Sequence, residues 1–338
     1  HAEINDVVSN ITNSNTKADL PNYIHYEDYL ENGGYEIWKA CRDGDLERDQ
    51  IIESVDQSGL RGLGGAGFPT ARKWGFLKNT PKPRLVAINA DEGEPGTFKD
   101  RHCLETDPHR ILEGILIAAW AVEADAAYIY LRDEYPQCRA LLLDEIDRLT
   151  AEGITGNIQL HLRRGAGAYI CGEESAMLES IEGKRGLPRN RPPFPAQEGL
   201  FRRPTLINNV ETMFWLRDIV TNGPDWYQEQ GRPHFYSVSG RVKNPGVKLA
   251  PAGVTANQLI NQYSGGMEDG HTFRAYLPGG ASGGILPAGK SDLPLDFGSL
   301  DEYGCFIGSS AVVIFSDHDN IRSICHNLVS FFEYESCG

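Results

Sequence analysis

The sequence predicts an α/β protein whose main domain is built on a parallel sheet. Short apolar segments alternate with stretches of helical periodicity, and this alternation is typical of βαβ units. After Pro233 the chain changes to short strands and many glycines, which indicates a second, smaller α+β domain. A length of 338 residues is enough for about two domains, each with its own core.

The elements of the first domain follow in order along the chain. A helix is expected over residues 35–55, and another begins after Asp107, a favourable N-cap that precedes Pro108. The remaining elements expected are strands over residues 84–90, 127–131 and 158–162 and helices over residues 137–152 and 205–219.

The second domain is expected to contain shorter elements. These are strands over residues 235–242, 246–249 and 311–315 and a small helix over residues 255–262, followed by an amphipathic helix over residues 320–335. We therefore divide the chain into a linker or extension (1–26), an α/β domain (27–232), an α+β domain (233–318) and a final helical segment (319–338).

Charge and composition exclude several classes of protein. The net charge of −15, from 32 basic and 47 acidic residues, argues against a nucleic-acid-binding surface. No apolar run reaches the roughly 18–20 residues of a transmembrane helix, and nothing resembles a secretory signal. Seven cysteines without paired spacing are typical of reduced thiols. We expect a cytoplasmic protein without direct membrane insertion; because it begins with His1 rather than Met, we expect a processed or excerpted N-terminus.

The first candidate site is a glycine-dense loop, GLGGAGFPT, over residues 62–70. Its spacing satisfies G-x-G-x-x-G, but no apolar strand precedes it and no helix follows at once, so an ordinary dinucleotide-binding turn is not expected. Glycines at this density let a ligand approach the backbone. Lys73 could neutralise a phosphate, and Phe68 and Phe76 suit adenine stacking. The alternative is a tight structural turn with solvated basic residues.

The second candidate site is the polar stretch from Asn89 to Gly96, which follows the strand over residues 84–90. Ligands in α/β sheets bind at the carboxyl ends of strands. Carboxylates there can accept hydrogen bonds from ribose hydroxyls, a carboxamide or flavin N–H groups. The alternative is a polar surface turn, since turns favour Asn, Asp and Gly.

A second glycine loop, over residues 164–175, leads into a helix at Glu173 and Glu174. The helix dipole stabilises acidic residues in a first turn, so capping alone could explain both; the glycines upstream favour a ligand. Asn208 and Thr212 lie four residues apart on the helix expected over residues 205–219 and would share a face. Their amide and hydroxyl groups fit cofactor recognition, with a solvated polar face as the alternative.

Together these segments resemble one family closely. It is the NADH-binding, FMN-containing diaphorase subunit of respiratory complex I and its relatives, which include NAD-linked hydrogenases and molybdenum- or tungsten-containing, NAD-dependent formate dehydrogenases. The likeness covers residues 29–338, with motifs at 64–70, 89–96, 165–175 and 204–212. It implies a Rossmann-like domain for FMN and NADH, a ubiquitin-like β-grasp domain, and the first helix of a bundle that carries a [4Fe-4S] cluster.

The resemblance also implies positions for both nucleotides. Glu94 and Glu174 would contact the nicotinamide half of NADH and are the catalytic candidates, in a positioning role. Arg191 would contact the other end of NADH. The adenine would lie among Phe68, Phe76 and Phe194. The implied FMN site comprises Gly62, Gly64, Gly65, Gly67, Lys73, Asn89, Asp91, Glu92, Tyr169, Gly172, Glu173, Asn208, Asn209 and Thr212.

Four positions qualify the resemblance. Leu63 stands where the family usually has Arg, Ala71 where it has Gly, and Arg191 where it often has Lys. None of these changes removes a main-chain donor for phosphate. Cys337 matches the first cysteine of the family's Ser-Cys-Gly-x-Cys-x-x-Cys motif, so the other ligands of the [4Fe-4S] cluster are expected beyond residue 338.

Three stretches favour one branch of the family. The loop around Leu63, residues 185–193 and residues 278–287 resemble the β subunit of soluble formate dehydrogenases more than the complex I subunit. The expected reaction is hydride transfer between NAD(H) and FMN, with single electrons exchanged with iron–sulfur clusters, in an enzyme that converts formate and NAD⁺ to CO₂ and NADH. The expected partners are a molybdenum or tungsten catalytic α subunit and a [2Fe-2S] thioredoxin-like subunit or domain.

Other assignments stay open. The chain could be the complex I subunit itself or the diaphorase subunit of a hydrogenase. An alternative of another class is a redox-inert assembly subunit that keeps the fold without a flavin. An ordinary NAD dehydrogenase is disfavoured, because the context of the first glycine loop does not match a dinucleotide-binding turn.

Overall fold

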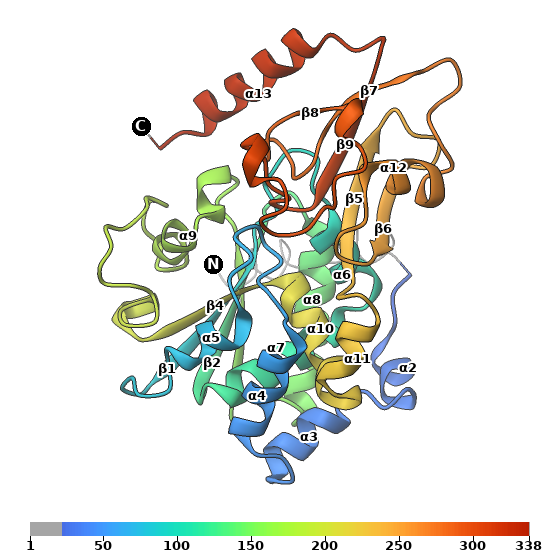
Figure 1. Ribbon diagram of the computed structural model, residues 1–338. Coiled ribbons are helices and arrows are strands. Elements are labelled where there is room, and N and C mark those ends of the chain that lie inside the picture. Colours follow the sequence, from blue (N-terminus) through green and yellow to red (C-terminus); the bar gives the residue numbers. More distant parts are fainter. Residues whose placement is uncertain (1–21, 338) are drawn as a thin grey trace, which may run out of the picture.

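Two β-sheets organise the chain in the computed structural model, which describes residues 22–337 (Figure 1). The first sheet is entirely parallel, with the strand order β3-β2-β1-β4. Its strands are β1 (Arg84–Ala90), β2 (Ala124–Leu131), β3 (Gln159–Arg164) and β4 (Thr205–Asn209). This parallel sheet with helices on both faces confirms the predicted α/β class.

Helices pack on both faces because the strand residues alternate between two cores. Val86 and Ile88 of β1 belong to the larger core, whereas Leu85 and Ala87 belong to a smaller core. The helices around the larger core are α2 (Tyr26–Glu31), α3 (Glu36–Asp43), α4 (Arg48–Ser58), α5 (Thr70–Gly75), α6 (Lys99–Thr106), α7 (Pro108–Ala121), α8 (Pro136–Ala151), α10 (Val210–Asn222) and α11 (Pro224–Glu229). The smaller core packs under α9 (Glu174–Ile181).

Local signals fixed some helix ends correctly. Asp107 caps α7, since its side chain accepts from the Arg110 amide, and Pro108 is the first helical residue. The single helix expected over residues 35–55 is wrong: Gly44, with φ of 86°, ends α3, and α4 begins at Arg48.

Two other expectations need correction. The helix expected over residues 205–219 begins as strand β4, which pairs with β1, and only α10 is helical. Residues 1–21 of the expected linker lie outside the described residues. Its end does not behave as a linker, because Tyr23 donates a hydrogen bond to Glu145 and Tyr26 begins α2.

The second sheet is mixed, with the order β6-β5-β9-β7-β8. Its first and last strands lie in the centre and run parallel, which is the strand order of a β-grasp module. The strands are β5 (His234–Gly240), β6 (Gly246–Ala250), β7 (Phe273–Leu277), β8 (Leu286–Pro287) and β9 (Ala311–Ser316), with α12 (Ala256–Gln258) and a π-helical turn (Leu259–Tyr263) after β6. The sequence did not predict β7 or β8.

The last helix, α13 (Ile321–Glu335), lies across the second sheet and extends toward α9 (Figure 1). Ile321, Ile324 and Leu328 pack on Leu277 and Phe315 of that sheet. Across residues 22–337, no helix has the length and apolar character needed to cross a membrane.

Candidate functional site

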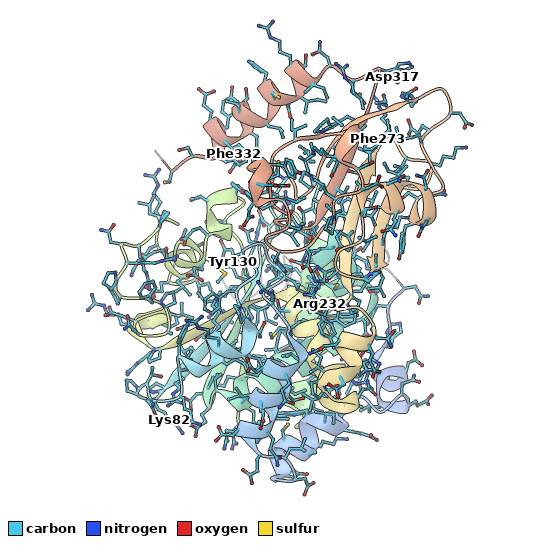
Figure 2. The ribbon with its side chains drawn as sticks, in the orientation of Figure 1. Lys82, Tyr130, Arg232, Phe273, Asp317 and Phe332 are labelled. Atoms are coloured by element: carbon cyan, nitrogen blue, oxygen red, sulfur yellow. The ribbon has the colours of Figure 1, made fainter. Side chains whose placement is uncertain are left out.

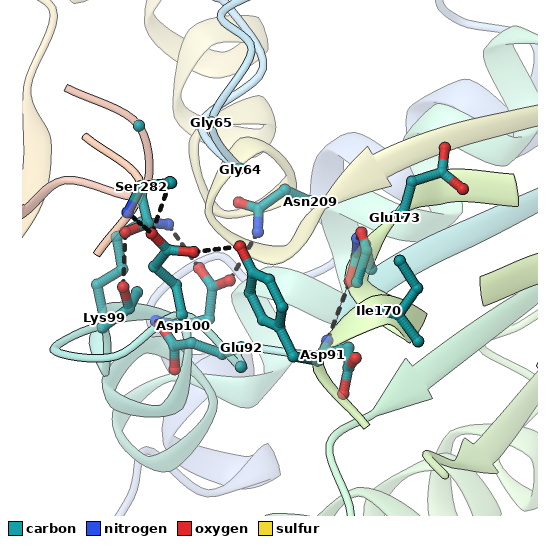
Figure 3. A pocket seen from close by; sticks show the side chains of 18 of the residues that line it. Gly64, Gly65, Asp91, Glu92, Lys99, Asp100, Ile170, Glu173, Asn209 and Ser282 are labelled. Atoms are coloured by element: carbon teal, nitrogen blue, oxygen red, sulfur yellow. Dashed lines mark hydrogen bonds and ion pairs between the residues drawn. The ribbon is translucent and has the colours of Figure 1, made fainter. Parts of the chain in front are cut away.

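A pocket of about 310 Å³ lies at the carboxyl ends of β1 and β4 (Figure 3). The chain places β2 and β3 on one side of β1 and β4 on the other, so β1 and β4 flank the point where the strand order reverses. Ligands of α/β proteins bind in the crevice at such a point. Asn89 and Asn209, which end the two strands and pair in register, both line the pocket.

Three predicted segments meet in this pocket. The first glycine loop, the polar end of β1 and the second glycine loop all contribute lining residues. The predicted residues that line it are Gly64, Gly65, Asn89, Asp91, Glu92, Glu94, Tyr169, Gly172, Glu173 and Asn209. Segments some hundred residues apart in sequence thus form one site.

The pocket also has walls that sequence reasoning missed. The second sheet's loops contribute Ser282, Phe306 and Gly308, and α6 contributes Lys99 and Asp100. The only sequence signal for the loop that carries Ser282 is the glycine density of residues 279–284. The pocket therefore lies between the parallel-sheet core and the β-grasp module.

The first glycine loop is held against α10. The Leu63 amide donates to Thr212 Oγ1 at 3.0 Å. A Cβ on Gly64 would lie 2.9 Å from Asn209 Cβ, so only glycine fits at this position without movement. Gly65 has φ of 139°, in the region that glycine favours. Gly64 and Gly65 thus present bare backbone to the pocket.

Several predicted residues support this loop and do not line the pocket. The Gly62 amide donates to the Phe68 carbonyl, and a Cβ on Gly67 would collide with the ring of Phe297. Asn208 Oδ1 accepts from Trp74 Nε1 at 3.0 Å. Asn208 and Thr212 do not share a helix face, because Asn208 belongs to β4.

The carboxylates at the end of β1 differ in their environments. Asp91 Oδ2 is buried in the pocket and has no hydrogen-bond partner among residues 22–337. Burial raises the pKa of Asp91 to about 7. Glu92, in contrast, accepts from the amides of Asp100 and Arg101 and from Tyr135 Oη. Glu92 therefore anchors the start of α6, and Asp91 is free to accept from a ligand.

Glu94 connects the two halves of the pocket. Its Oε2 accepts from Tyr169 Oη at 2.5 Å, and its Oε1 accepts from the amide and hydroxyl of Ser282 at 2.7 and 2.6 Å (Figure 3). Tyr169 begins the short 3₁₀ helix η2 (Tyr169–Gly172), and Ser282 belongs to the β-grasp module. The phenol and the serine fix the carboxylate at the edge of the pocket.

A separate charged group lies at the start of α9. Glu174 pairs with Lys73 at 3.3 Å and with Arg191 at 3.1 Å. Glu173 accepts from the amides of Ser175 and Ala176, so capping accounts for one of its oxygens, and the other pairs with Arg191. Glu173 lines the pocket, whereas Lys73, Glu174 and Arg191 lie outside its lining.

The three predicted adenine-contacting phenylalanines are exposed. Phe68 and Phe76 lie with ring centroids 6.0 Å apart and are 38% and 51% exposed. Phe194 is 52% exposed. None of the three lines the pocket. Large apolar side chains left in solvent are typical of ligand-binding surfaces.

A buried ion cluster supports the pocket from below. Lys99 Nζ lies 2.8 Å from Asp100 Oδ1 and 2.9 Å from Glu211 Oε2, and its side chain is 1% exposed. The other oxygen of Asp100 accepts from Asn209 Nδ2 at 2.6 Å. The cluster thus orients an amide that lines the pocket, and no local sequence pattern indicated it.

Comparisons with known proteins agree with this geometry. Residues 55–218 match the family model described as the Nuo51 FMN-binding domain. The chain is 42% identical to the F 2 subunit of the NADH-quinone oxidoreductase of Rhizobium meliloti, over 95% of this chain and 79% of that protein. It is 40% identical to the corresponding NADH-quinone oxidoreductase protein of Escherichia coli, over 92% and 73%. The chain belongs to the complex I flavoprotein family. The expected diaphorase family and its flavin cofactor are thereby confirmed.

A solved relative of the flavoprotein family comes from a hydrogenase. The air-oxidized NAD⁺-reducing [NiFe]-hydrogenase contains a chain that superimposes with a TM-score of 0.78 at 39% identity. The match covers 86% of our chain and 50% of the hydrogenase chain, so our chain spans about half the length of that relative. The relatives named here are complex I and hydrogenase proteins, and closeness to formate dehydrogenases stays a prediction.

The residues present fit the flavin of this family. Bare backbone at Gly64 and Gly65 allows close approach, as nucleotide phosphates require. The unpartnered Asp91 oxygen and the two strand-end amides of Asn89 and Asn209 supply acceptors and donors for a polar ring system. Residues 22–337 contain no group of three or more potential ligands that could hold a metal ion, and Cys337 is exposed.

Proposed function

We propose that this chain is the diaphorase module of a larger oxidoreductase. In this module FMN and NAD(H) meet in the pocket between the parallel sheet and the β-grasp module. The observation that carries the proposal is the meeting of both glycine loops around a buried, unpartnered carboxylate oxygen of Asp91 at the sheet's switch point. When bound, FMN exchanges a hydride with the nicotinamide and single electrons with iron–sulfur centres.

The pocket residues bind and orient. Gly64 and Gly65 give the flavin access to the backbone, and Asp91 accepts from an N–H group. Tyr169 and Ser282 hold the carboxylate of Glu94 toward the nicotinamide side. No side chain has to donate or accept a proton during hydride transfer, so these residues act by positioning.

The charged group at the start of α9 extends this site toward the rest of NADH. We assign Glu174 to the nicotinamide half and Arg191 to the opposite end, where the pair also holds Lys73. The exposed rings of Phe68, Phe76 and Phe194 would stack on the adenine. Stacking on an aromatic ring contributes about 1–3 kcal/mol per base in nucleic-acid sites.

Acid extraction tests the cofactor assignment. The full-length protein should release FMN, and only FMN, when it is acid-precipitated, because no covalent attachment is expected. It should also reduce ferricyanide with NADH. A colourless protein without flavin would instead identify the redox-inert assembly subunit.

The cluster assignment is a further part of the proposal. Cys337 follows α13 by two residues, and we assign it as one ligand of a [4Fe-4S] cluster in a bundle that α13 opens. Cys337→Ser in the full-length protein should alter one electron paramagnetic resonance signal and leave the flavin content unchanged. An unchanged spectrum would contradict this assignment.

For the complete enzyme we propose a formate dehydrogenase with a molybdenum or tungsten α subunit and a [2Fe-2S] thioredoxin-like partner. Support comes from the three stretches that resemble the β subunits of those enzymes. One of them, residues 278–287, contributes Ser282 to the pocket, and the loop around Leu63 contributes Gly64 and Gly65.

The native complex distinguishes the three assemblies. A formate dehydrogenase should reduce NAD⁺ with formate and contain molybdopterin with molybdenum or tungsten. Hydrogen-dependent reduction of NAD⁺ with nickel in the preparation would identify a hydrogenase. Co-purification with a quinone-reducing membrane arm, without formate activity, would identify complex I.

A further inference from the structure

The end of α13 contacts the loop that forms one wall of the pocket. The Tyr169 amide donates to Glu335 Oε2 at 2.9 Å, across 166 residues of sequence. The same tyrosine donates from Oη to Glu94 at 2.5 Å and lines the pocket. One residue therefore joins the last turn of α13 to the carboxylate proposed to meet the nicotinamide.

Aromatic contacts strengthen this junction. The Tyr169 ring meets Phe331 edge-to-face at 5.1 Å between centroids, and Phe332 lies at 6.1 Å. Figure 2 shows Phe332 on the end of α13 nearest to η2. Edge-to-face pairs prefer a defined geometry, so they restrict the orientation of the phenol.

The backbone of η2 needs an acceptor from outside its own segment. The first amides of any helix lack intrahelical partners, and Ala168, which precedes η2, has no side chain that could cap it. Glu335 supplies a charged acceptor at this position. The carboxylate is thus coupled to the orientation of η2, whose last residue, Gly172, also lines the pocket.

We propose that Glu335 is a positioning residue of the nucleotide site, which holds η2 so that the Tyr169 phenol reaches Glu94. The inference rests on the proposed function, because the nucleotide site itself is part of that proposal. It makes the last turn of α13 part of the support of the pocket, in addition to its expected place near the cluster.

Three variants of the full-length protein test this role. Glu335→Ala removes the acceptor, and Glu335→Gln keeps an acceptor oxygen without the charge. Glu333→Ala is the matched control, because Glu333 is an exposed carboxylate on the same turn of α13. The readouts are the FMN dissociation constant of the flavin-depleted protein by flavin fluorescence, the KM for NADH, the iron content and the thermal midpoint.

We expect Glu335→Ala to weaken FMN binding about tenfold and to raise the KM for NADH, as loss of a hydrogen bond to a charged group does. Glu335→Gln should recover most of this loss, and Glu333→Ala should match the wild type. If Glu335→Ala equals Glu333→Ala, the inference is overturned. It is also overturned if the loss comes with lost iron or a lower thermal midpoint and Glu335→Gln does not restore it, since the defect would then be a general one of the helix end.

The proposed function fails separately. If the wild-type protein binds neither FMN nor NADH, the diaphorase assignment is wrong whatever the variants do. If the wild type binds both and the two alanine variants behave alike, only the role of Glu335 is wrong.

Discussion

Lys99→Met tests whether the buried ion cluster supports the pocket. The methionine matches the length of the lysine side chain but carries no charge, so Asp100 and Glu211 lose their shared counter-ion. Burial by itself lowers the pKa of the Lys99 amine, but the neighbouring charges of Asp100 and Glu211 outweigh it and hold the pKa above its usual value. The native cluster therefore favours the charged lysine.

The expected cost follows from the burial of all three groups. Removing one partner of a buried pair costs about 3–5 kcal/mol, because it leaves an uncompensated charge. With an unfolding entropy of about 2.1 cal/mol/K per residue, this corresponds to a fall of roughly 4–7 °C in the thermal midpoint of a chain of this length.

Thermal unfolding of the flavin-depleted protein measures this difference. Lys78→Met is the matched control, because Lys78 pairs with Asp49 at 3.0 Å while the two side chains are 62% and 77% exposed. An exposed pair contributes about 1 kcal/mol at most, so the control should lose less than about 2 °C. The deficit of Lys99→Met should shrink toward pH 5, because the unpaired carboxylates then bind protons.

A second substitution checks the cause. Adding Glu211→Gln to Lys99→Met removes one unpaired charge and keeps the oxygen that accepts from the Phe235 amide. The double variant should recover part of the lost stability. Equal midpoints for Lys99→Met and Lys78→Met, or no recovery in the double variant, would refute the electrostatic reasoning.

Three more predictions concern residues that line the pocket. Glu94→Gln should lower kcat/KM for NADH by roughly 10–150-fold with little change in FMN content, because an amide cannot accept on both sides from Tyr169 and Ser282; unchanged NADH–ferricyanide activity would contradict its role. Burial raises the pKa of Asp91 from 3.8 to about 7, so the folded state binds the proton more tightly than the unfolded chain, and stability of the flavin-depleted protein should fall as pH rises through this window. Asp91→Asn should reduce that fall, as thermal midpoints at pH 5 and pH 8 can show; an equal fall in both proteins would rule this out. Gly64→Ala should weaken FMN binding, since its Cβ meets Asn209, whereas Gly75→Ala should not, since its Cβ meets no atom within 4 Å; equal FMN affinities would refute the tight-approach argument.

The sequence by itself determined the features that depend on neighbouring residues. Alternation of short apolar runs and helical periods is a local pattern, and it predicted the α/β class and three of the four parallel strands. The cap of α7 at Asp107 was also readable, because a cap bonds within its own turn. The glycine loops marked where the backbone must be bare, and two of their residues, Gly64 and Gly65, line the pocket.

Only the tertiary structure decided the features that depend on partners far along the chain. Thr205–Asn209 is a strand because β1 offers it hydrogen bonds, and a short apolar run cannot be distinguished from a helix start by its own pattern. The same holds for Lys99, whose charge is paired by the distant Glu211, and for Ser282, which reaches Glu94 from another sheet. Glu335 belongs with them, since its acceptor role exists only where α13 meets η2. Such contacts depend on how elements pack, and packing is a property of the whole chain.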